Sequence, residues 1–491
     1  MIKPKKNYER ILELYKNGKY SEINMIYDLS KNDFKSNTKI LNILGISLIH
    51  EKSYDKAIDV FEKIAAINPK DNNVKINLGN LYRLTGQFEL ALKFFDNYQK
   101  TNKKSYQVYY NLALTHIELG NNELAKKNFS LSLDCAPSDD TNLINQICEY
   151  YIKTLIDSGQ NDTAFEVCNH LIIKFPKSYI LYWRLANLST WSNKEEKAQN
   201  FYKKAMDIEP YNQALKFDFA IWCKKNGKNN DAIEILKGLD FSQARAHYIL
   251  TLFQLGKNSE FQEQLANACF DYKGNRLIAN LSKYVSYLNN QVDQYPFCED
   301  PFSFIYTNNI GNEELLNNVL NKIDSLALNS TNQKLLKNGF QSSGNLFQLE
   351  SPEINQLKEI ILNEIGIYKS HFSQGNEYFI ENWPKNSTLK SWYINLKEGG
   401  TLDYHIHPDG WVSGTVYLEV PKTANDIEGS IQFGFNNANY KFIEGLPTKT
   451  FKPKRSDIVI FPSSLSHRVN PFQDKKNDSR RVSLAFDLIP T

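Results

Sequence analysis

The stretch LNILGISLIHEKSYDKAIDVFEKIAAINP, residues 41–69, decides the fold, because its small, aromatic and proline residues return at fixed intervals along the chain. A small residue, an alanine and a phenylalanine each recur with a period of 34 residues. The positions in phase are Gly45, Gly79 and Ala113, then Ala57, Ala91 and Ala125, then Phe61, Phe95 and Phe129. A period of this length predicts an array of one repeated supersecondary unit.

The same pattern resumes after an insertion of five residues, with Ala164, Ala198 and Ala232 again 34 residues apart. Each unit predicts a helix hairpin, in which small residues let the helices touch and a proline ends the second helix. The pattern resembles the tetratricopeptide repeat. Six units fall between about 37 and 240, a degenerate unit precedes them, and another fades by about 270. The resemblance implies an α-solenoid over residues 1–270 whose concave face binds a protein or peptide.

Composition excludes several other classes of protein. The chain has 491 residues, too many for one core, and its formal net charge of +3 comes from interspersed acidic and basic side chains. We therefore expect neither nucleic acid nor a membrane as partner. No apolar run is long enough to span a bilayer. The six cysteines form no CxxC pair, which favours reduced thiols and a cytoplasmic location.

The 34-residue period is lost from about residue 271, and the proline and polar content of residues 289–304 predicts a linker over 271–300. Residues 312–328 and 351–372 then carry apolar side chains at helical spacing. Five short stretches with strand patterns follow, at 389–397, 412–420, 429–435, 457–463 and 480–489. The sequence thus predicts a multidomain α + β protein. Its C-terminal domain, 301–491, would be a double-stranded β-helix (jelly roll) with flanking helices.

Two of only eight histidines lie in YHIHPDGW, residues 404–411, at His405 and His407. A third, His467, follows a later strand, and Arg481 lies on the last one. In a double-stranded β-helix these strand ends meet at one mouth of the barrel. Non-haem Fe(II) takes two imidazoles and usually a carboxylate on one face. Two ligand sets are open: His405, His407 and His467, or His407, Asp409 and His467.

Several motifs of residues 300–491 resemble a family of 2-oxoglutarate/Fe(II) oxygenases often found behind tetratricopeptide repeats. They are GFQSSGNLF (339–347), HIHPDGWVSGTVYLEVP (405–421), GSIQF (429–433), FPSSLSHRVNPF (461–472) and RVSLAF (481–486). The resemblance implies Fe(2+), 2-oxoglutarate and O₂ as cofactor and cosubstrates. It favours His405 and His407 as metal ligands together with His467. It also implies that Arg481 and Ser483 hold the 2-oxoglutarate.

Strand alternation agrees with this, because it places Arg481, Ser483 and Ala485 on one face. Two further groups complete the expected site: Tyr393 and Asn395 as cosubstrate contacts, and Trp411, Ser413 and Tyr417 as the substrate pocket.

The resulting hypothesis is an Fe(II)- and 2-oxoglutarate-dependent dioxygenase of the hydroxylase type, whose repeats dock a protein or peptide partner or substrate. One alternative is a non-catalytic interaction scaffold with an inactive oxygenase-like domain. Another keeps the enzyme but gives it a small molecule or sugar as substrate. The sequence holds no GxxxxGK[ST] loop and no GxSxG elbow.

Overall fold

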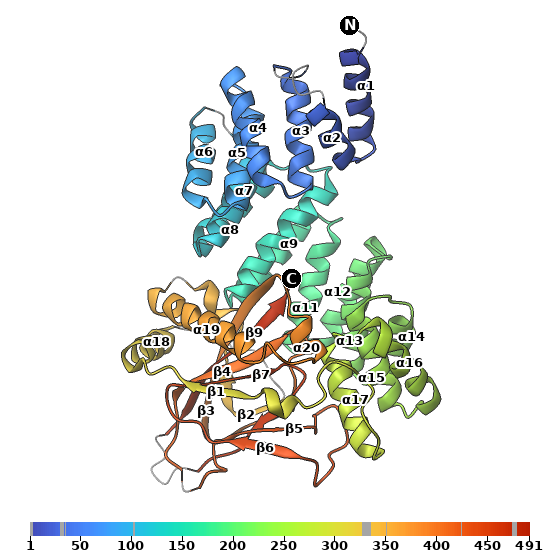
Figure 1. The fold of residues 1–491 in the computed structure, drawn as a ribbon, viewed down its shortest axis with the longest axis vertical. Coiled ribbons are helices and arrows are strands. Elements are labelled where there is room, and N and C mark those ends of the chain that lie inside the picture. The colour runs from blue at the N-terminus through green and yellow to red at the C-terminus, as the bar shows by residue number, and fades with distance from the viewer. Residues whose placement is uncertain are drawn as a thin grey trace. The chain divides into compact units, whose positions relative to one another are not determined.

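The computed structural model describes residues 3–29, 34, 36–101, 104–326, 335–349, 351–423, 425–473 and 479–491. It divides into two compact units, residues 1–154 and 155–491, so that the division falls inside a helix, α9. The first unit is a succession of helices (Figure 1). They are α1 (Lys3–Lys16), α2 (Tyr20–Leu29), α3 (Thr38–His50), α4 (Tyr54–Ile67), α5 (Asn72–Leu84), α6 (Phe88–Thr101), α7 (Tyr106–Glu118), α8 (Asn122–Cys135) and the start of α9 (Thr141–Asp157).

The repeat positions of the first unit lie where the sequence predicts, between the two helices of a hairpin. A Cβ atom on Gly45 would lie 2.5 Å from the Phe61 ring, and one on Gly79 would lie 2.5 Å from the Phe95 ring. Each aromatic side chain therefore packs directly on the small residue of its own hairpin. This contact explains why the small residue and the phenylalanine recur together.

The second unit begins with further helix hairpins. They are α10 (Asn161–Lys174), α11 (Tyr179–Trp191), α12 (Glu195–Ile208), α13 (Gln213–Lys225), α14 (Asn229–Lys237), α15 (Ser242–Gln254), α16 (Asn258–Asp271) and α17 (Arg276–Leu288). The last of these, α17, occupies much of the stretch expected to be a linker. Its N-terminus is capped by Asn275, and its apolar residues from Leu277 to Val285, among them Leu281, are buried.

Within the described residues, the C-terminal part of this unit combines five short or flanking helices with nine strands. The helices are η1 (Pro301–Phe304), α18 (Glu313–Ser325), η2 (Leu346–Gln348), α19 (Pro352–His371) and the single turn α20 (Tyr378–Glu381). The strands are β1 (Tyr306–Asn309), β2 (Leu336–Gln341), β3 (Ser387–His405), β4 (Val412–Glu419), β5 (Ile431–Gly434), β6 (Thr448–Phe451), β7 (Asp457–Pro462), β8 (Ser466–Val469) and β9 (Arg481–Pro490).

The described strands form one antiparallel sheet in the order β1-β7-β4-β9-β3-β8-β5-β6, with β2 beside β3. Strand β3 is long enough to pair with two different strands of the sheet along its length. Residues 387–396 pair with β9, and the end of β3 pairs with β8. The strand continues through Gly399, whose φ of +69° fits the bulge in its pairing. The sheet curves into a half-barrel, and the predicted succession of a helical solenoid and a β domain with flanking helices is confirmed. The double-stranded β-helix (jelly roll) predicted for 301–491 is not clearly formed, because the described strands make one sheet instead of two.

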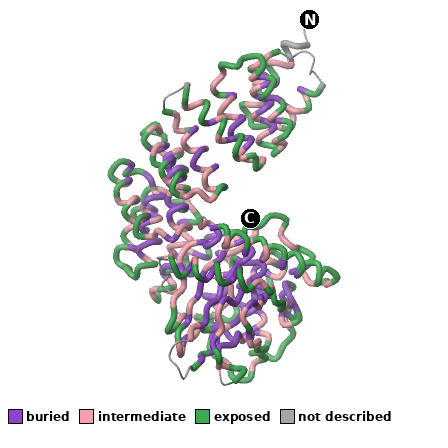
Figure 2. Tube along the Cα trace, turned by 90° about the vertical axis from the view of Figure 1, so that its left-hand side faces the viewer, coloured by how far each residue is buried: buried purple, intermediate pink, exposed green. Residues whose placement is uncertain are grey.

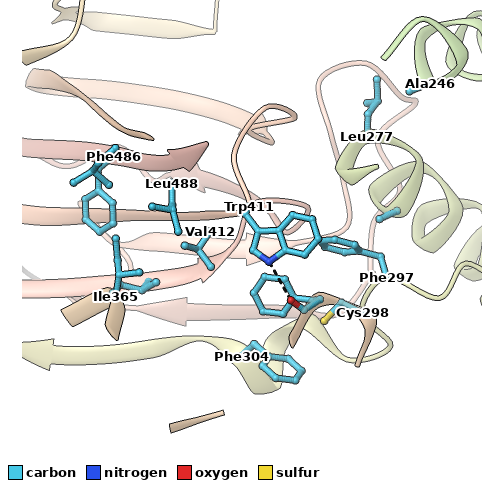
Figure 3. Packing of buried hydrophobic residues seen from close by; sticks show 14 of the residues in the cluster. Ala246, Leu277, Phe297, Cys298, Phe304, Ile365, Trp411, Val412, Phe486 and Leu488 are labelled. Carbon is cyan, nitrogen blue, oxygen red and sulfur yellow. Dashed lines mark hydrogen bonds between the residues drawn. The ribbon is translucent and has the colours of Figure 1, made fainter. Parts of the chain in front are cut away.

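One hydrophobic core joins the last repeats to the sheet. This single cluster of buried residues in contact includes residues from Ala220 on α13 to Leu488 on β9. Figure 3 shows part of it, with Trp411 between Phe297 and the strands, and Figure 2 shows buried residues throughout this part of the chain. Polar contacts add to the join, since Asn280 Nδ2 on α17 donates to the Ser464 carbonyl over 3.0 Å. Residues 155–491 therefore form one compact unit, without the division at 271–300 that the sequence indicated.

Candidate metal centre

Strand pairing brings His405 and His467 together. The two residues are directly opposite each other in the antiparallel pair β3 and β8, and their ring centroids are 4.3 Å apart. His407 lies two residues beyond His405, and its ring centroid is 5.2 Å from that of His405 and 5.1 Å from that of His467. One ligand nitrogen from each of the three rings lies within 4.8 Å of the others.

The Nδ1 atom of each ring has an acceptor nearby. The His405 Nδ1 atom lies 2.9 Å from the Asp403 carbonyl oxygen, and the His467 Nδ1 atom lies 3.3 Å from the Leu465 carbonyl oxygen. The His407 Nδ1 atom lies 2.6 Å from Asp487 Oδ1. A carbonyl oxygen only accepts, so Nδ1 carries the hydrogen in His405 and His467. Their Nε2 lone pairs are then free for a metal.

Burial also favours the ligating form of two rings. Desolvation, followed by the neighbouring His407, lowers the pKa of His405 to about 3. Desolvation, with smaller contributions from the other two rings, holds the pKa of His467 well below its usual value. Both imidazoles are therefore neutral near pH 7, which is the form that binds metal ions.

The three histidines open into a cavity of about 240 Å³ that also contains Arg481 and Ser483. Its apolar wall includes Trp392, Ile394, Leu402, Ile431, Phe461, Val469 and Ala485. The structure thus brings six of the predicted site residues to one cavity, the alternative ligand Asp409 included, from strands β3, β8 and β9 and the turn after β3. The apolar wall limits the access of water to the histidines and the arginine.

Arg481 is a buried cation, with only 2% of its surface exposed. Its Nε atom donates to the Gly429 carbonyl over 3.0 Å, and its guanidinium carbon lies 4.9 Å from the centre of the Tyr417 ring. The described residues include no carboxylate in an ion pair with it. Desolvation lowers its pKa, although a guanidinium remains charged at neutral pH. A buried cation facing a cavity is suited to bind an anionic group of a ligand.

Asp409, the alternative metal ligand, does not belong to the group of three converging histidines. It lines the cavity but is exposed, and its Oδ1 atom accepts a hydrogen bond from Gln243 Nε2 over 3.2 Å. The geometry therefore distinguishes between the two ligand sets that the sequence left open. Within the described residues, the converging set is the one that contains His405.

Tyr393 and Asn395 are not among the residues that line the cavity. Their strand neighbours Trp392 and Ile394 line it instead, because these are directly opposite Ala485 and Ser483 of β9. The Tyr393 hydroxyl donates to Asp324 of α18 over 3.2 Å, which places the pair on the outer side of the sheet.

The three residues expected in a substrate pocket lie behind the cavity wall. The Trp411 indole is buried and donates to the Phe379 carbonyl over 3.0 Å (Figure 3). Tyr417 is fully buried beneath Arg481. Ser413 has a supporting position, since its hydroxyl donates to Asp487 Oδ1 over 2.6 Å and contacts Ser463.

Asp487 is the residue that the sequence reasoning missed. It lies on β9 in alternation with Arg481, Ser483 and Ala485, and it accepts from both His407 and Ser413. The signal was present, because the alternation in RVSLAFD extends two residues further than the face predicted from the sequence. A close approach at Gly410 completes the arrangement: a Cβ there would lie 2.6 Å from Ser463 Oγ and 3.2 Å from Asp487 Cγ.

We expect Asp487→Ala to weaken Fe(II) binding by about 10- to 100-fold, because His407 loses the carboxylate that orients its ring and keeps only the Ser413 hydroxyl, 3.1 Å from its Nδ1 atom. Asp487→Asn should lose less, since the amide oxygen still accepts from Nδ1. Anaerobic titration calorimetry measures both. The control is Asp403→Asn, which removes an exposed carboxylate near His405 but keeps the carbonyl that His405 contacts. An equal loss in this control, or no loss at residue 487, would contradict the assignment.

Comparison with protein families agrees with this geometry. Residues 390–487 match the family described as "Putative 2OG-Fe(II) oxygenase", and residues 48–106 and 106–139 match tetratricopeptide repeat families. The chain combines tetratricopeptide repeats with a domain of this oxygenase family. The matched stretch of the oxygenase domain contains all three histidines, Arg481 and Asp487.

Curated relatives match this chain over part of their length. The protein O-mannosyl-transferase TMTC3 of Homo sapiens is 23% identical over 203 residues, covering 40% of this chain and 22% of that protein. Superkiller protein 3 of Schizosaccharomyces pombe is 30% identical over 108 residues, covering 21% of this chain and 8% of that protein. The chain thus spans less than a quarter of the length of either protein.

Solved structures show similarity of the same kind. A tetratricopeptide repeat protein from Parabacteroides merdae covers 51% of this chain and 98% of its own at 18% identity, with a TM-score of 0.38. YrrB, described as a repeat protein with an unusual peptide-binding site, covers 38% of this chain and 95% of its own at 15% identity, with a TM-score of 0.28.

The oxygenase domain's donor set fits the cofactors of its family. Three imidazoles leave half of an octahedral Fe(II) site open, which is what binding a bidentate 2-oxo acid together with O₂ requires. The buried Arg481, without a carboxylate partner among the described residues, supplies a counter-charge for a dicarboxylate. The described helices include none long and apolar enough to cross a membrane.

Proposed function

We propose that the oxygenase domain is an Fe(II)- and 2-oxoglutarate-dependent dioxygenase that hydroxylates its substrate. The observation that carries the proposal is the convergence of His405, His407 and His467 in one cavity with the buried cation of Arg481. Neither element alone would be as specific, because isolated histidines and isolated arginines are common in proteins. A metal group beside an anion site, in a cavity with an apolar wall, matches the needs of this chemistry.

In this proposal the chain's own residues hold and orient the reactants. His405, His407 and His467 hold the iron, and Asp487 fixes the ring of His407. Arg481 and Ser483 bind the distal carboxylate of 2-oxoglutarate. The bound iron supplies redox chemistry in which one oxygen atom of O₂ enters a substrate C–H bond and the other enters succinate, as 2-oxoglutarate loses CO₂. The apolar wall keeps water from competing with the substrate.

The repeats serve in the same proposal to dock a protein or peptide, as a partner or as the substrate. Tetratricopeptide arrays present an extended concave surface, which suits a polypeptide better than a small molecule. This part rests on analogy at the level of the fold.

The full chain with Fe(II), 2-oxoglutarate and O₂ is expected to form succinate slowly even without substrate. Release of labelled CO₂ from 2-oxoglutarate measures this turnover. Omitting iron, or replacing 2-oxoglutarate by glutarate, which lacks the keto oxygen needed for chelation, should abolish it. If the chain binds neither iron nor 2-oxoglutarate, the domain is a non-catalytic scaffold.

A further inference from the structure

A second cavity, of about 830 Å³, lies next to the metal cavity within residues 155–491. One wall comes from the end of α9 and from α10 and α11, and the other from residues 341–344 and strands β3 and β9. The two cavities share four lining residues: Gln341, Trp392, Asp409 and Asp487. We call the larger cavity the repeat-side groove. It is more than three times the volume of the metal cavity and adjoins it.

The repeat-side groove is strongly acidic. Its lining includes five carboxylates, on Asp157, Asp162, Glu166, Asp409 and Asp487, and two ammonium groups, on Lys194 and Lys390. The Lys194 ammonium lies 5.5 Å from the centre of the Phe165 ring, so an aromatic face already accompanies one of the cations. Outside the lining, Arg276 faces Asp409, but it is mostly buried and donates to backbone carbonyls. The groove therefore retains an excess of negative charge.

The walls also offer groups suited to a peptide backbone and to apolar side chains. Ser343 Oγ and Asn161 Oδ1 are buried atoms that have no hydrogen-bonding partner in the described chain. Trp191, with 40% of its surface exposed, and Phe165 add apolar surface. The lining thus combines polar residues, Ser343 and Asn161, with the apolar surface of Trp191 and Phe165.

The wall formed by residues 341–344 is held firmly against the repeats. The Asn345 backbone N–H donates to the Asp157 carbonyl over 2.8 Å. A Cβ on Gly344 would lie 2.4 Å from the same oxygen, and this glycine has a φ of +82°. The chain can approach the repeats this closely only with glycine at that position. The shape of the groove is thus built into the fold of the second unit.

We propose that the repeat-side groove binds an extended polypeptide segment carrying a lysine or arginine side chain, and that it presents this segment to the metal cavity. The carboxylates attract the cationic side chain and repel nucleic acid. The volume exceeds what a single cationic side chain fills, and the carboxylates are spread over α9, α10, β9 and the turn before β4. That the bound segment is oxidised rests on the proposed function, whereas its binding does not.

The test measures peptide binding to the full chain without iron or 2-oxoglutarate. Fluorescein-labelled nine-residue peptides of Gly, Ala and Ser carry either lysine or glutamate at three positions. We expect the lysine peptide to bind and the glutamate peptide not to bind, by fluorescence anisotropy. Asp162→Asn with Glu166→Gln should weaken lysine-peptide binding about three- to tenfold, because two partly screened charge contacts are lost. Raising the salt concentration should weaken binding in the unmodified chain.

The matched control is Glu196→Gln with Asp207→Asn, two exposed carboxylates of α12 that do not line the groove. Equal weakening by this pair would overturn the proposal, as would unchanged binding in the groove variant or equal binding of the glutamate peptide. If spermidine binds as tightly as the lysine peptide, the groove recognises positive charge alone, and the proposal of a polypeptide ligand is wrong.

A second readout separates this proposal from the proposed function. With iron and 2-oxoglutarate present, the lysine peptide should raise CO₂ release, and the groove variant should need more peptide for the same increase. If the chain binds the peptide in the groove but binds no iron, the peptide-binding proposal stands and the proposed dioxygenase function is wrong. If turnover depends on iron but the groove variant binds the peptide unchanged, the dioxygenase function stands and the peptide-binding proposal is wrong.

Discussion

The His467→Leu variant is expected to lose Fe(II) binding by roughly 100-fold or more, because loss of a direct ligand should exceed the 10- to 100-fold effect of outer partners. Leucine is chosen to keep the variant folded. His467 is 6% exposed, and its ring centroid lies 4.7 Å from that of Phe461, so an apolar side chain fits its surroundings. Anaerobic titration calorimetry with Fe(II) measures the loss, and circular dichroism checks the fold.

Two comparisons make this result specific. His371→Ala changes an exposed histidine at the end of α19 and should leave Fe(II) binding unchanged. His405→Ala should resemble His467→Leu, whereas Asp409→Asn should bind Fe(II) like the unmodified chain. The opposite pattern, with Asp409 required and His405 dispensable, would restore the ligand set with a carboxylate.

Arg481→Met is expected to weaken 2-oxoglutarate binding by about 30-fold or more, because truncating one partner of a buried charged pair costs at least about 2 kcal/mol. The stability of the ligand-free chain, by contrast, should not fall. In the ligand-free chain this guanidinium is buried without a carboxylate among the described residues. Its removal should leave the free energy of unfolding equal or higher, because an apolar side chain replaces a desolvated charge.

Arg480→Met provides the control for this prediction on the neighbouring residue. Arg480 immediately precedes β9 and pairs with Asp324 and with Glu419, the latter over 2.8 Å. Its loss should change 2-oxoglutarate binding little, because both ion pairs lie outside the cavity. The calorimetric titration must be paired with denaturant unfolding of each variant. Retained 2-oxoglutarate binding in Arg481→Met would contradict the anion site.

The parts of the fold that the sequence predicted well are those with a strict period. The 34-residue recurrence at Gly45 and Gly79 reflects a contact in which a Cβ would meet the ring of Phe61 or Phe95. The position therefore takes only small residues, with alanine at Ala113 in the third unit. The alternation on β9 likewise identified the face with Arg481 and Ser483, because side chains on a strand alternate between its two sides.

Other features depend on pairing between distant strands, which one sequence does not display. Tyr393 and Asn395 were attractive as polar residues, yet the register that sets Ile394 opposite Ser483 turns them to the outer face. The helix α17 was hidden by the loss of the repeat period, and its buried residues 277–282 are consecutive, so they do not mark a single apolar face. The cytoplasmic location and the docking of a protein or peptide by the repeats stay predictions.

The central claim is that three histidines and Arg481 hold one iron ion and one 2-oxoglutarate. Its most direct test is an anaerobic titration of the full chain with Fe(II) and then 2-oxoglutarate, followed by the visible charge-transfer absorption of the chelate. The account predicts one chelate per chain, absent in His467→Leu and shifted to higher 2-oxoglutarate concentration in Arg481→Met. A chelate of equal strength in His467→Leu, or none in the unmodified chain, would contradict it.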